Sequence, residues 1–598
     1  MWRIVVLFAP LALILGCEAR QMKYWERVSL GPVPEETHIL SIKCKSDGVL
    51  VGTFGLGALF SEDGGKTWRL FATSENGDST GLSLNYILGG DWDGSYIILA
   101  TLGDGLNIST DDGATWKRLG YNFFGVEYLY CVGVTIQDGT KYVPTADGIV
   151  YFSHEIDPAQ SYSERPYKTI DKTQGLASQY IYDMIKKGKN VYVGSLHDFS
   201  FSSNNGGAWR NFAPSGKRAS NGVSPDKVRA VAVSGNEWYA GCDGGLFVSG
   251  DEGETWKDIS EGLPSPFVHD LLIDRSGNLW VATYKGVAKS GDGGASYQLF
   301  GKESGFYGES INSLAEGGRG NIYAGTNYGL YRLADKLPAR NVYPEPQAEF
   351  TKTEEPAHQW MLRPVSPDDN NQRDQTYLYG AKMGGYFRQH QGCEYNNPEG
   401  TPLLAVDDGT IVYRNDEIGH TVLKCDRRFG DLYVYAHYHH MSVITRNVGD
   451  RIDRGDVIGA VGKRGNVTNE HLHFEVSLSD KDDPNVPNRT VNNELWQEPL
   501  PGCGTIVGAV TDKEGKLIIG AKIYGVEKPV PTETPFSYAE TYRDSVNSSP
   551  AYGENFVIAD VPAGAYLLWV EDGDSKYAVK ALVEPSMVTR VKLVISPK

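Results

Sequence analysis

Seven of the twelve histidines lie in one stretch that carries the residue types of a hydrolytic metal site. His390 and Glu394 are four residues apart, and His471 and His473 are two apart, where apolar and polar residues alternate as in β-strands. Strand side chains switch faces at every residue, so each pair can share one face of a sheet. Two imidazoles and a carboxylate are a common ligand set of catalytic zinc, which keeps a fourth position open for water or substrate. His437 and His471 then remain to handle protons.

The segments around these residues carry a family resemblance. "GTPLLAVDDGTIVY" follows the first pair, and "VGDRIDRGDVIGAVG" precedes the last. With these motifs, residues 357–500 resemble the lysostaphin-type (LytM-like) zinc metallopeptidases, which cut the peptide part of bacterial cell-wall peptidoglycan. Glu394 stands where that family usually has aspartate. The resemblance implies the zinc ligands His390, Glu394 and His473, and a catalytic pair made of His471 and His437, the latter from a Y-x-H segment.

Peptide hydrolysis is the chemistry that such a site performs. Zinc lowers the pKa of a bound water to about 7 and polarises the carbonyl that is attacked. His437 and His471 would orient the water, stabilise the oxyanion and protonate the leaving amine, because imidazole titrates near neutral pH. We interpret the neighbouring His439 and His440 as surface residues or outer neighbours of the site.

The first seventeen residues predict export. Arg3 is followed by an apolar run of about a dozen residues, which is typical of a signal peptide and too short for a membrane span. "ILGC", ending at Cys17, resembles a bacterial lipobox. We expect cleavage before Cys17 and lipidation of its thiol, which tethers the exported protein to a membrane, with an ordinary secretion signal as the alternative. Glu18 follows the cysteine, and we expect the outer membrane where there is one.

Charge and cysteine content exclude several classes of function. The net charge of -18 argues against nucleic acid, which requires a basic surface, and against electrostatic binding to an anionic membrane. Six cysteines remain after lipidation, without C-x-x-C spacing, so neither a disulfide-dense scaffold nor a cysteine zinc site is indicated. Cys393, Cys425 and Cys503 leave room for one disulfide, but we expect buried thiols.

A repeat fills residues 22–335. "SEDGGKTW" at Ser61 recurs with variations at intervals of 41 to 49 residues, the size of a four-stranded propeller blade. The phrase resembles the Asp-box (BNR repeat) of sialidase-like and sortilin-like β-propellers, where it forms a structural turn. Seven units predict a seven-bladed propeller. The last unit lacks a strand, and we expect "KYWERVSL", with Trp25, to complete it and remove the sheet edge.

Two further segments complete the predicted all-β chain. Residues 336–356 are rich in Pro, Glu, Lys and Thr and predict an extended linker. Residues 503–598 show short alternating strands with "KEG" and "PAG" turns, which predict a small β-sandwich. This segment resembles the transthyretin-like, carboxypeptidase regulatory-like domain. We expect it to bind, to space or simply to stabilise its neighbours.

The leading hypothesis is a lipid-anchored, zinc-dependent endopeptidase that acts on peptidoglycan or another envelope peptide. The alternative is a metal-free degenerate peptidase that activates another wall hydrolase. A third hypothesis is a sialidase whose active site lies in the propeller. The sequence argues against it, because no "FRIP"-like segment precedes Ser61. The sequence names neither the bond that is cut nor the ligand of the propeller.

Overall fold

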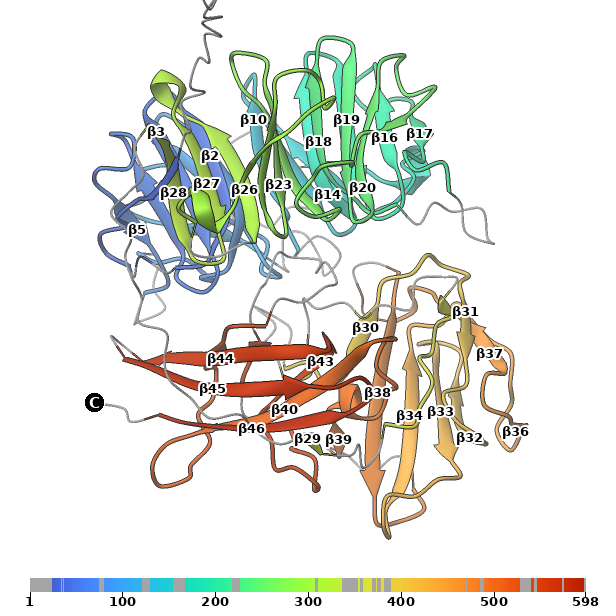
Figure 1. Cartoon of the computed structure of the whole chain (residues 1–598). Helices are drawn as coiled ribbons and strands as arrows, with labels where there is room; N and C mark the ends of the chain where they lie inside the picture. The colour runs from blue at the N-terminus through green and yellow to red at the C-terminus, as the bar shows by residue number, and fades with distance from the viewer. Residues whose placement is uncertain are drawn as a thin grey trace, which may run out of the picture.

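The computed structural model of the chain is all-β, as the sequence predicts (Figure 1). Its only helices among the described residues are single 3-10 turns, and none of them is long and apolar enough to cross a membrane. The predicted lipidation site, Cys17, lies outside the described residues. The structure describes residues 24–595 except 34, 36, 75–79, 121–129, 154–166, 218–225, 307–309, 336–352, 355–358, 368–372, 374–377, 381–388, 466, 468, 469, 484–488, 527–538, 543–545, 573 and 574.

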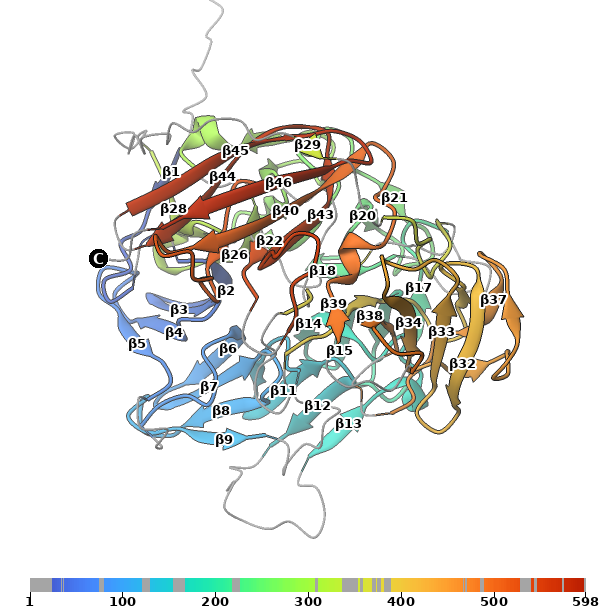
Figure 2. The ribbon, with the colours of Figure 1, turned by 90° about the horizontal axis from the view of Figure 1, so that it is seen from below.

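Four-stranded sheets follow one another round a ring in the first half of the chain (Figure 2). In each sheet, strands consecutive in the chain pair antiparallel, which is how a propeller blade is built. A seventh sheet joins residues 311–334 to the N-terminal strand. Within the described residues, the other six sheets span 39–71, 87–119, 135–170, 181–212, 228–258 and 268–300.

The N-terminal strand completes the last of these sheets, as predicted. β1 (Tyr24–Arg27) pairs antiparallel with β28 (Gly329–Ala334), with Trp25 opposite Leu333. The Trp25 side chain is fully buried and packs against the rings of Trp280 and Phe306. Burying so large a ring at the joint closes the ring of sheets, and the pairing covers the edge that β28 would otherwise leave free.

The repeated phrase forms turns whose polar atoms are used locally. In the first copy, Ser61 Oγ accepts from the backbone N–H of Gly65 at 2.8 Å, and Asp63 Oδ1 accepts from that of Thr67 at 2.9 Å. The same bonds recur in the other intact copies, for example at Ser249. These bonds hold the turn, so the phrase has a structural role.

The predicted peptidase segment contains a larger antiparallel sheet with a small sheet beside it. The order of the main sheet is β30-β38-β34-β33-β32-β36, and β39 also pairs with β38. The strands of the main sheet are β30 (Cys393–Tyr395), β38 (Leu472–Ser479), β34 (Tyr433–His439), β33 (His420–Cys425), β32 (Gly409–Asn415), β36 (Arg451–Ile452) and β39 (Thr490–Val491). The small sheet consists of β31 (Pro402–Leu404), β37 (Val457–Ala460) and β35 (Val443–Ile444).

The C-terminal strands lie beside this sheet under the propeller (Figure 1). One sheet has the order β29-β46-β40-β43, and two hairpins, β44-β45 and β41-β42, accompany it. The bounds are β29 (Thr353–Glu354), β40 (Cys503–Thr511), β41 (Lys522–Ile523), β42 (Ala539–Glu540), β43 (Phe556–Pro562), β44 (Gly564–Asp572), β45 (Ser575–Val583) and β46 (Val588–Val594). β29 belongs to the segment that the sequence predicts as a linker, so part of that segment is a strand.

The predicted peptidase and C-terminal segments share one hydrophobic core. Phe474 and Trp496 of the first belong to the same buried cluster as Val507 and Val588 of the second. Asp560 of β43 also accepts hydrogen bonds from two buried guanidinium groups, those of Arg363 and Arg373, at 2.5 Å each. Breaking such a buried ion group is costly, so the two segments support each other.

The propeller contacts both segments below it. Tyr524 and Trp569 pack into an aromatic cluster with Tyr130 and Tyr180 of the propeller.

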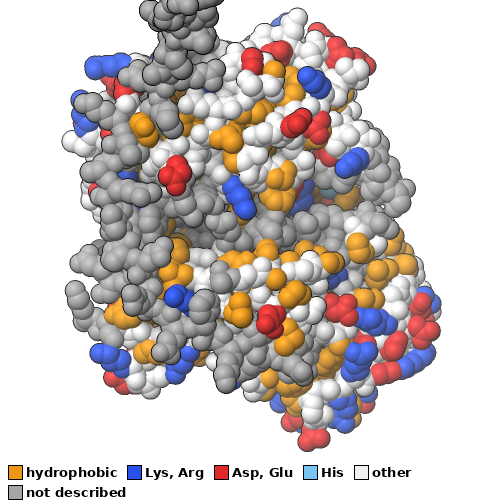
Figure 3. Space-filling model, viewed as in Figure 1, with side chains coloured by type: hydrophobic (Ala, Val, Ile, Leu, Met, Phe, Trp, Pro, Cys, Tyr) orange, Lys and Arg blue, Asp and Glu red, His pale blue; other side chains and the backbone are white. Residues whose placement is uncertain are grey.

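Charged side chains of both signs intermix over the outer end of the lower layer (Figure 3), so this face carries no purely basic surface.

Candidate metal centre

Three of the predicted site residues converge on one point. The donor atoms of His390, Glu394 and His473 all lie within 4.8 Å of one another. His390 Nε2 is 3.0 Å from His473 Nδ1 and 3.4 Å from Glu394 Oε1. The separations are close to the spacing of about 3.3 Å that follows for ligands 2.0–2.1 Å from a tetrahedral zinc. The chemistry and geometry of these three groups therefore fit a zinc ion.

The sheet register explains this convergence. Glu394 on β30 lies opposite His473 on β38, and His439 on β34 lies opposite His473 on its other side. Residues opposite one another project from the same face, so three neighbouring strands present a row of polar groups. Cys393 points to the other face, where its sulfur accepts a hydrogen bond from Asn493.

Glu475 supports the row from the next position on the same face. Its Oε1 is 3.0 Å from Nε2 of His473, which leaves Nδ1 of that ring toward His390. A metal-bound histidine usually donates its other N–H to a carboxylate, which fixes the ring and makes it a better ligand. Burial disfavours a charged ring here, but the bond and charge of Glu475 outweigh it and raise the pKa of His473.

Glu394 stays ionised in this setting. Burial would raise its pKa, but the nearby rings of His471, His390 and His473 outweigh burial and lower it to about 2. An ionised carboxylate is the form that binds a metal. The longer side chain of glutamate therefore reaches the same point as its histidine partners while keeping its charge.

His471 lies beside the ligand group, and its ring neighbour is His440. His471 Nε2 is 3.7 Å from Glu394 Oε1, and the ring centroids of His440 and His471 are 4.9 Å apart. His440 Nδ1 lies 2.8 Å from the carbonyl oxygen of Arg464. A carbonyl only accepts, so Nδ1 carries the proton and Nε2 offers a lone pair. His440 also has a positive φ of 65°, a strained conformation of the kind that clusters at functional sites.

His437, the predicted partner of His471, lies elsewhere on the sheet. It is opposite Glu475, and its Nε2 is 2.8 Å from Ser477 Oγ. Glu475 is four residues past His471, which corresponds to about 13 Å along a strand. The structure thus brings His440, and not His437, next to His471. A second Y-x-H segment, Tyr438 to His440, is the sequence signal that could have identified it.

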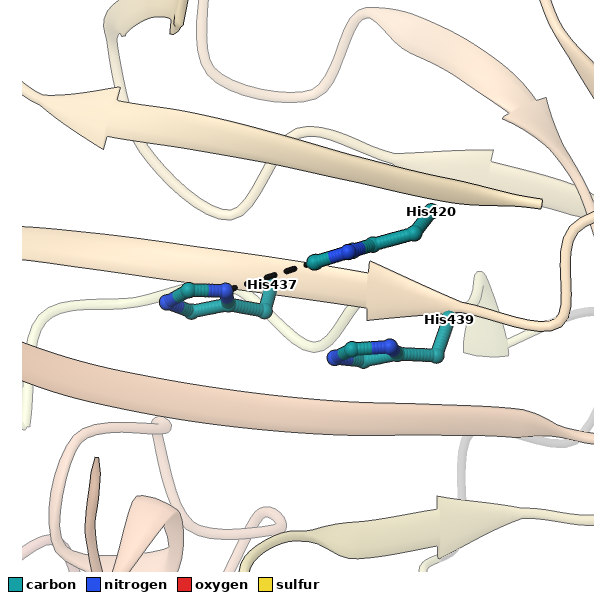
Figure 4. Close-up of side chains that lie close together, drawn as sticks. All are labelled: His420, His437 and His439. Carbon is teal, nitrogen blue, oxygen red and sulfur yellow. Dashed lines mark hydrogen bonds between the residues drawn. The ribbon is translucent and has the colours of Figure 1, made fainter. Parts of the chain in front are cut away.

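His437 instead belongs to a second group of imidazoles on the same face. The donor atoms of His420, His437 and His439 lie within 4.8 Å of one another (Figure 4). The ring centroids of His420 and His439 are 3.9 Å apart and nearly parallel. Burial lowers the pKa of all three, that of His420 to about 4, so these rings are neutral. His420 is not among the site residues predicted from the sequence.

Two ion pairs connect the candidate site to the propeller. Glu470, which precedes His471 and is almost fully buried, pairs with Lys172 of the propeller. Lys463 pairs with Asp147, also in the propeller. The sequence offers no signal for these pairs, because their partners are about 300 residues apart.

The described cysteines are free thiols, including Cys393, Cys425 and Cys503.

Parts of the chain match known protein families and known proteins in sequence. Residues 388–485 match the model of Peptidase family M23, and residues 262–285 match that of the two component regulator propeller. The DD-carboxypeptidase/endopeptidase Mpg of Neisseria meningitidis is 33% identical over 100 residues, 16% of this chain and 21% of that protein. The peptidoglycan DD-endopeptidase ShyC of Vibrio cholerae is 32% identical over 93 residues, 15% of this chain and 21% of that protein. The matches thus span about a fifth of the length of these relatives.

Among solved structures, YCF48 from Cyanidioschyzon merolae is 15% identical. Its alignment covers 52% of this chain and 98% of that one, with a TM-score of 0.39.

Proposed function

We propose that this protein is a zinc-dependent endopeptidase that hydrolyses peptide bonds in cell-wall peptidoglycan. The convergence of the donor atoms of His390, Glu394 and His473 carries the proposal. The match of residues 388–485 to Peptidase family M23, and the peptidoglycan-directed activity of a relative that aligns there, support a cell-wall peptide as the substrate. The metal-free alternative requires that this complete ligand set stays without an ion.

The chain's own residues supply the remaining parts of the reaction. Zinc, when bound, activates a water and polarises the scissile carbonyl. His440 Nε2 is positioned to take or hold a proton, because its Nδ1–H is fixed on the carbonyl of Arg464. His471, next to both His440 and Glu394, is placed to stabilise the oxyanion and to protonate the leaving amine. We therefore assign to His440 the catalytic role that the sequence predicted for His437.

The other segments position this site. We propose that Cys17 carries the lipid that anchors the exported protein to a membrane, in line with its lipobox. The propeller and the C-terminal sandwich hold the peptidase segment through buried contacts, including the pair of Lys172 with Glu470. The substrate thus meets a site whose rim is fixed by the propeller.

The test is metal content and hydrolysis in the full chain, because the peptidase segment shares its core with the C-terminal strands. We expect the wild type to cleave a cross-linked peptidoglycan peptide. Glu394→Ala should lose one equivalent of zinc and at least about 100-fold in hydrolysis, since even outer partners of a ligand are worth 10–100-fold. The matched control, Glu394→Asp, should keep both properties.

One outcome would establish the metal-free alternative. It is a wild-type chain that leaves this site empty in zinc-replete buffer, together with a Glu394→Asp chain that gains one equivalent.

A further inference from the structure

We propose that His420, His437 and His439 form a second metal site on the same sheet, which binds a divalent cation of the zinc, nickel or copper class. β33 contributes His420, and β34 contributes His437 and His439. The site goes beyond the proposed peptidase function, because it shares none of the three ligands of the first site.

The register of two adjacent strands places the three rings together. Thr421 lies opposite Tyr438, so the next residues along the strands, His420 and His439, are also neighbours. His437 follows on the same face, two residues from His439. Figure 4 shows the three imidazoles projecting from the sheet into one space, with the ring of His420 facing both others.

The distances suit ligation. His420 Nε2 lies 3.4 Å from His437 Nδ1. Two nitrogen ligands at 2.0–2.1 Å from a tetrahedral ion are about 3.3 Å apart. The pair therefore fits one ion without rearrangement, and the donor atom of His439 lies within 4.8 Å of both.

Ser477 prepares His437 for this role. His437 Nε2 is 2.8 Å from Ser477 Oγ, on the side of the ring away from His420. When Nε2–H donates to the hydroxyl, Nδ1 carries the lone pair that a metal needs. Metal-binding histidines are typically oriented by such an outer hydrogen bond.

One ring nitrogen of His439 is available as a metal ligand. Its Nε2 is buried and makes no hydrogen bond to any part of the chain that the structure describes. The nearest charged group is Glu475, whose Oε2 is 3.9 Å away, too far for a hydrogen bond. A buried polar atom without a partner costs free energy, and a cation among these rings would remove part of that cost.

The donor set selects the class of cation. Three imidazoles suit Zn²⁺, Ni²⁺ and Cu²⁺, whereas Ca²⁺ and Mg²⁺ require oxygen ligands. Glu475 stands between the two sites, since its other oxygen holds His473 at 3.0 Å. The two ions would therefore share one outer carboxylate.

The experiment counts ions in the full chain. Protein is dialysed against Zn²⁺ and analysed by mass spectrometry for bound metal, and a parallel Co²⁺ titration follows the visible absorption of each site. We expect two equivalents in the wild type. His420→Asn should bind one equivalent fewer than the wild type. Tyr413→Phe keeps the ring that packs against His420 and removes only a hydroxyl that bonds to Asn415, so it should bind as many as the wild type.

Glu394→Ala keeps the test independent of the proposed peptidase site. This variant should lose the first ion, retain one equivalent and keep the Co²⁺ spectrum of a histidine site. The proposal is overturned if His420→Asn binds as much metal as the wild type, or if Glu394→Ala, folded by circular dichroism, binds none.

Discussion

The two histidine clusters on one sheet face differ in their carboxylates. The first contains Glu394 and has Glu475 against His473, and the charges of these groups raise the pKa of His473. The second consists of imidazoles alone, and burial lowers the pKa of each. A carboxylate offsets part of the charge of a bound dication, whereas three neutral rings leave it uncompensated. We therefore expect the first cluster to bind a divalent cation more tightly than the second.

The clusters also differ in what lies beside them. Next to the first are His471 and His440, and the adjoining chain is fixed to the propeller through Glu470. Next to the second is Tyr413, whose ring packs on that of His420. The two candidate proton-transfer groups, His471 and His440, therefore lie beside the first cluster.

Replacing the two candidate bases gives the largest contrast between the clusters. We expect His440→Ala to lower kcat by about 10²–10⁴, the usual contribution of a general acid or base. His437→Ala, in the other cluster, should lower kcat by less than about tenfold. Steady-state hydrolysis of a cross-linked peptidoglycan peptide measures both values.

Metal content controls for indirect effects. His440→Ala should keep the zinc of the first cluster, because His440 is not one of its ligands. A larger loss of kcat in His437→Ala than in His440→Ala would return the catalytic role to His437 and refute our reassignment.

The sequence predicted the first cluster well and the second not at all, for a physical reason. The spacing of His390 with Glu394, and of His471 with His473, is short enough for strand periodicity to place them. His420 is 17 residues from His437, and only the register of β33 against β34 brings them together. The sequence does not distinguish His437 from His440, because two Y-x-H segments, 435–437 and 438–440, follow one another directly and only the end of β34 places one of the two histidines beside His471.

The same limit applies to the fold. Turn chemistry that repeats along the chain predicted the propeller and the closing strand with Trp25. The strand β29 pairs with β46, more than 200 residues away, so composition alone indicated a linker there. Local signals thus predicted what neighbouring residues form, and pairings between distant segments required the structure.

Glu475→Gln probes the group that separates the clusters. The amide keeps the size of the side chain but removes its charge, so His473 loses its ionic partner. We expect the zinc affinity of the first cluster to fall 10–100-fold, the usual effect of an outer ligand partner. Competition with a zinc chelator measures this affinity, and Glu417→Gln, at an exposed glutamate, is the matched control. An unchanged affinity would show that Glu475 does not support the ligand His473.

Ser477→Ala should produce the smallest effect, confined to the second cluster. The hydroxyl of Ser477 is 2.8 Å from His437 Nε2 and orients that ring toward His420. A hydrogen bond of this kind is worth about 1 kcal/mol, so its loss should weaken Co²⁺ binding at the second cluster about fivefold. Affinity at the first cluster should stay the same, because the hydroxyl of Ser477 bonds to His437, whereas His473 of the first cluster bonds to His390 and Glu475. Ser479→Ala, two residues further on the same face, removes a hydroxyl that serves Lys481 instead and is the matched control. If both serine variants weaken the second cluster equally, the effect comes from the strand and not from the orientation of His437.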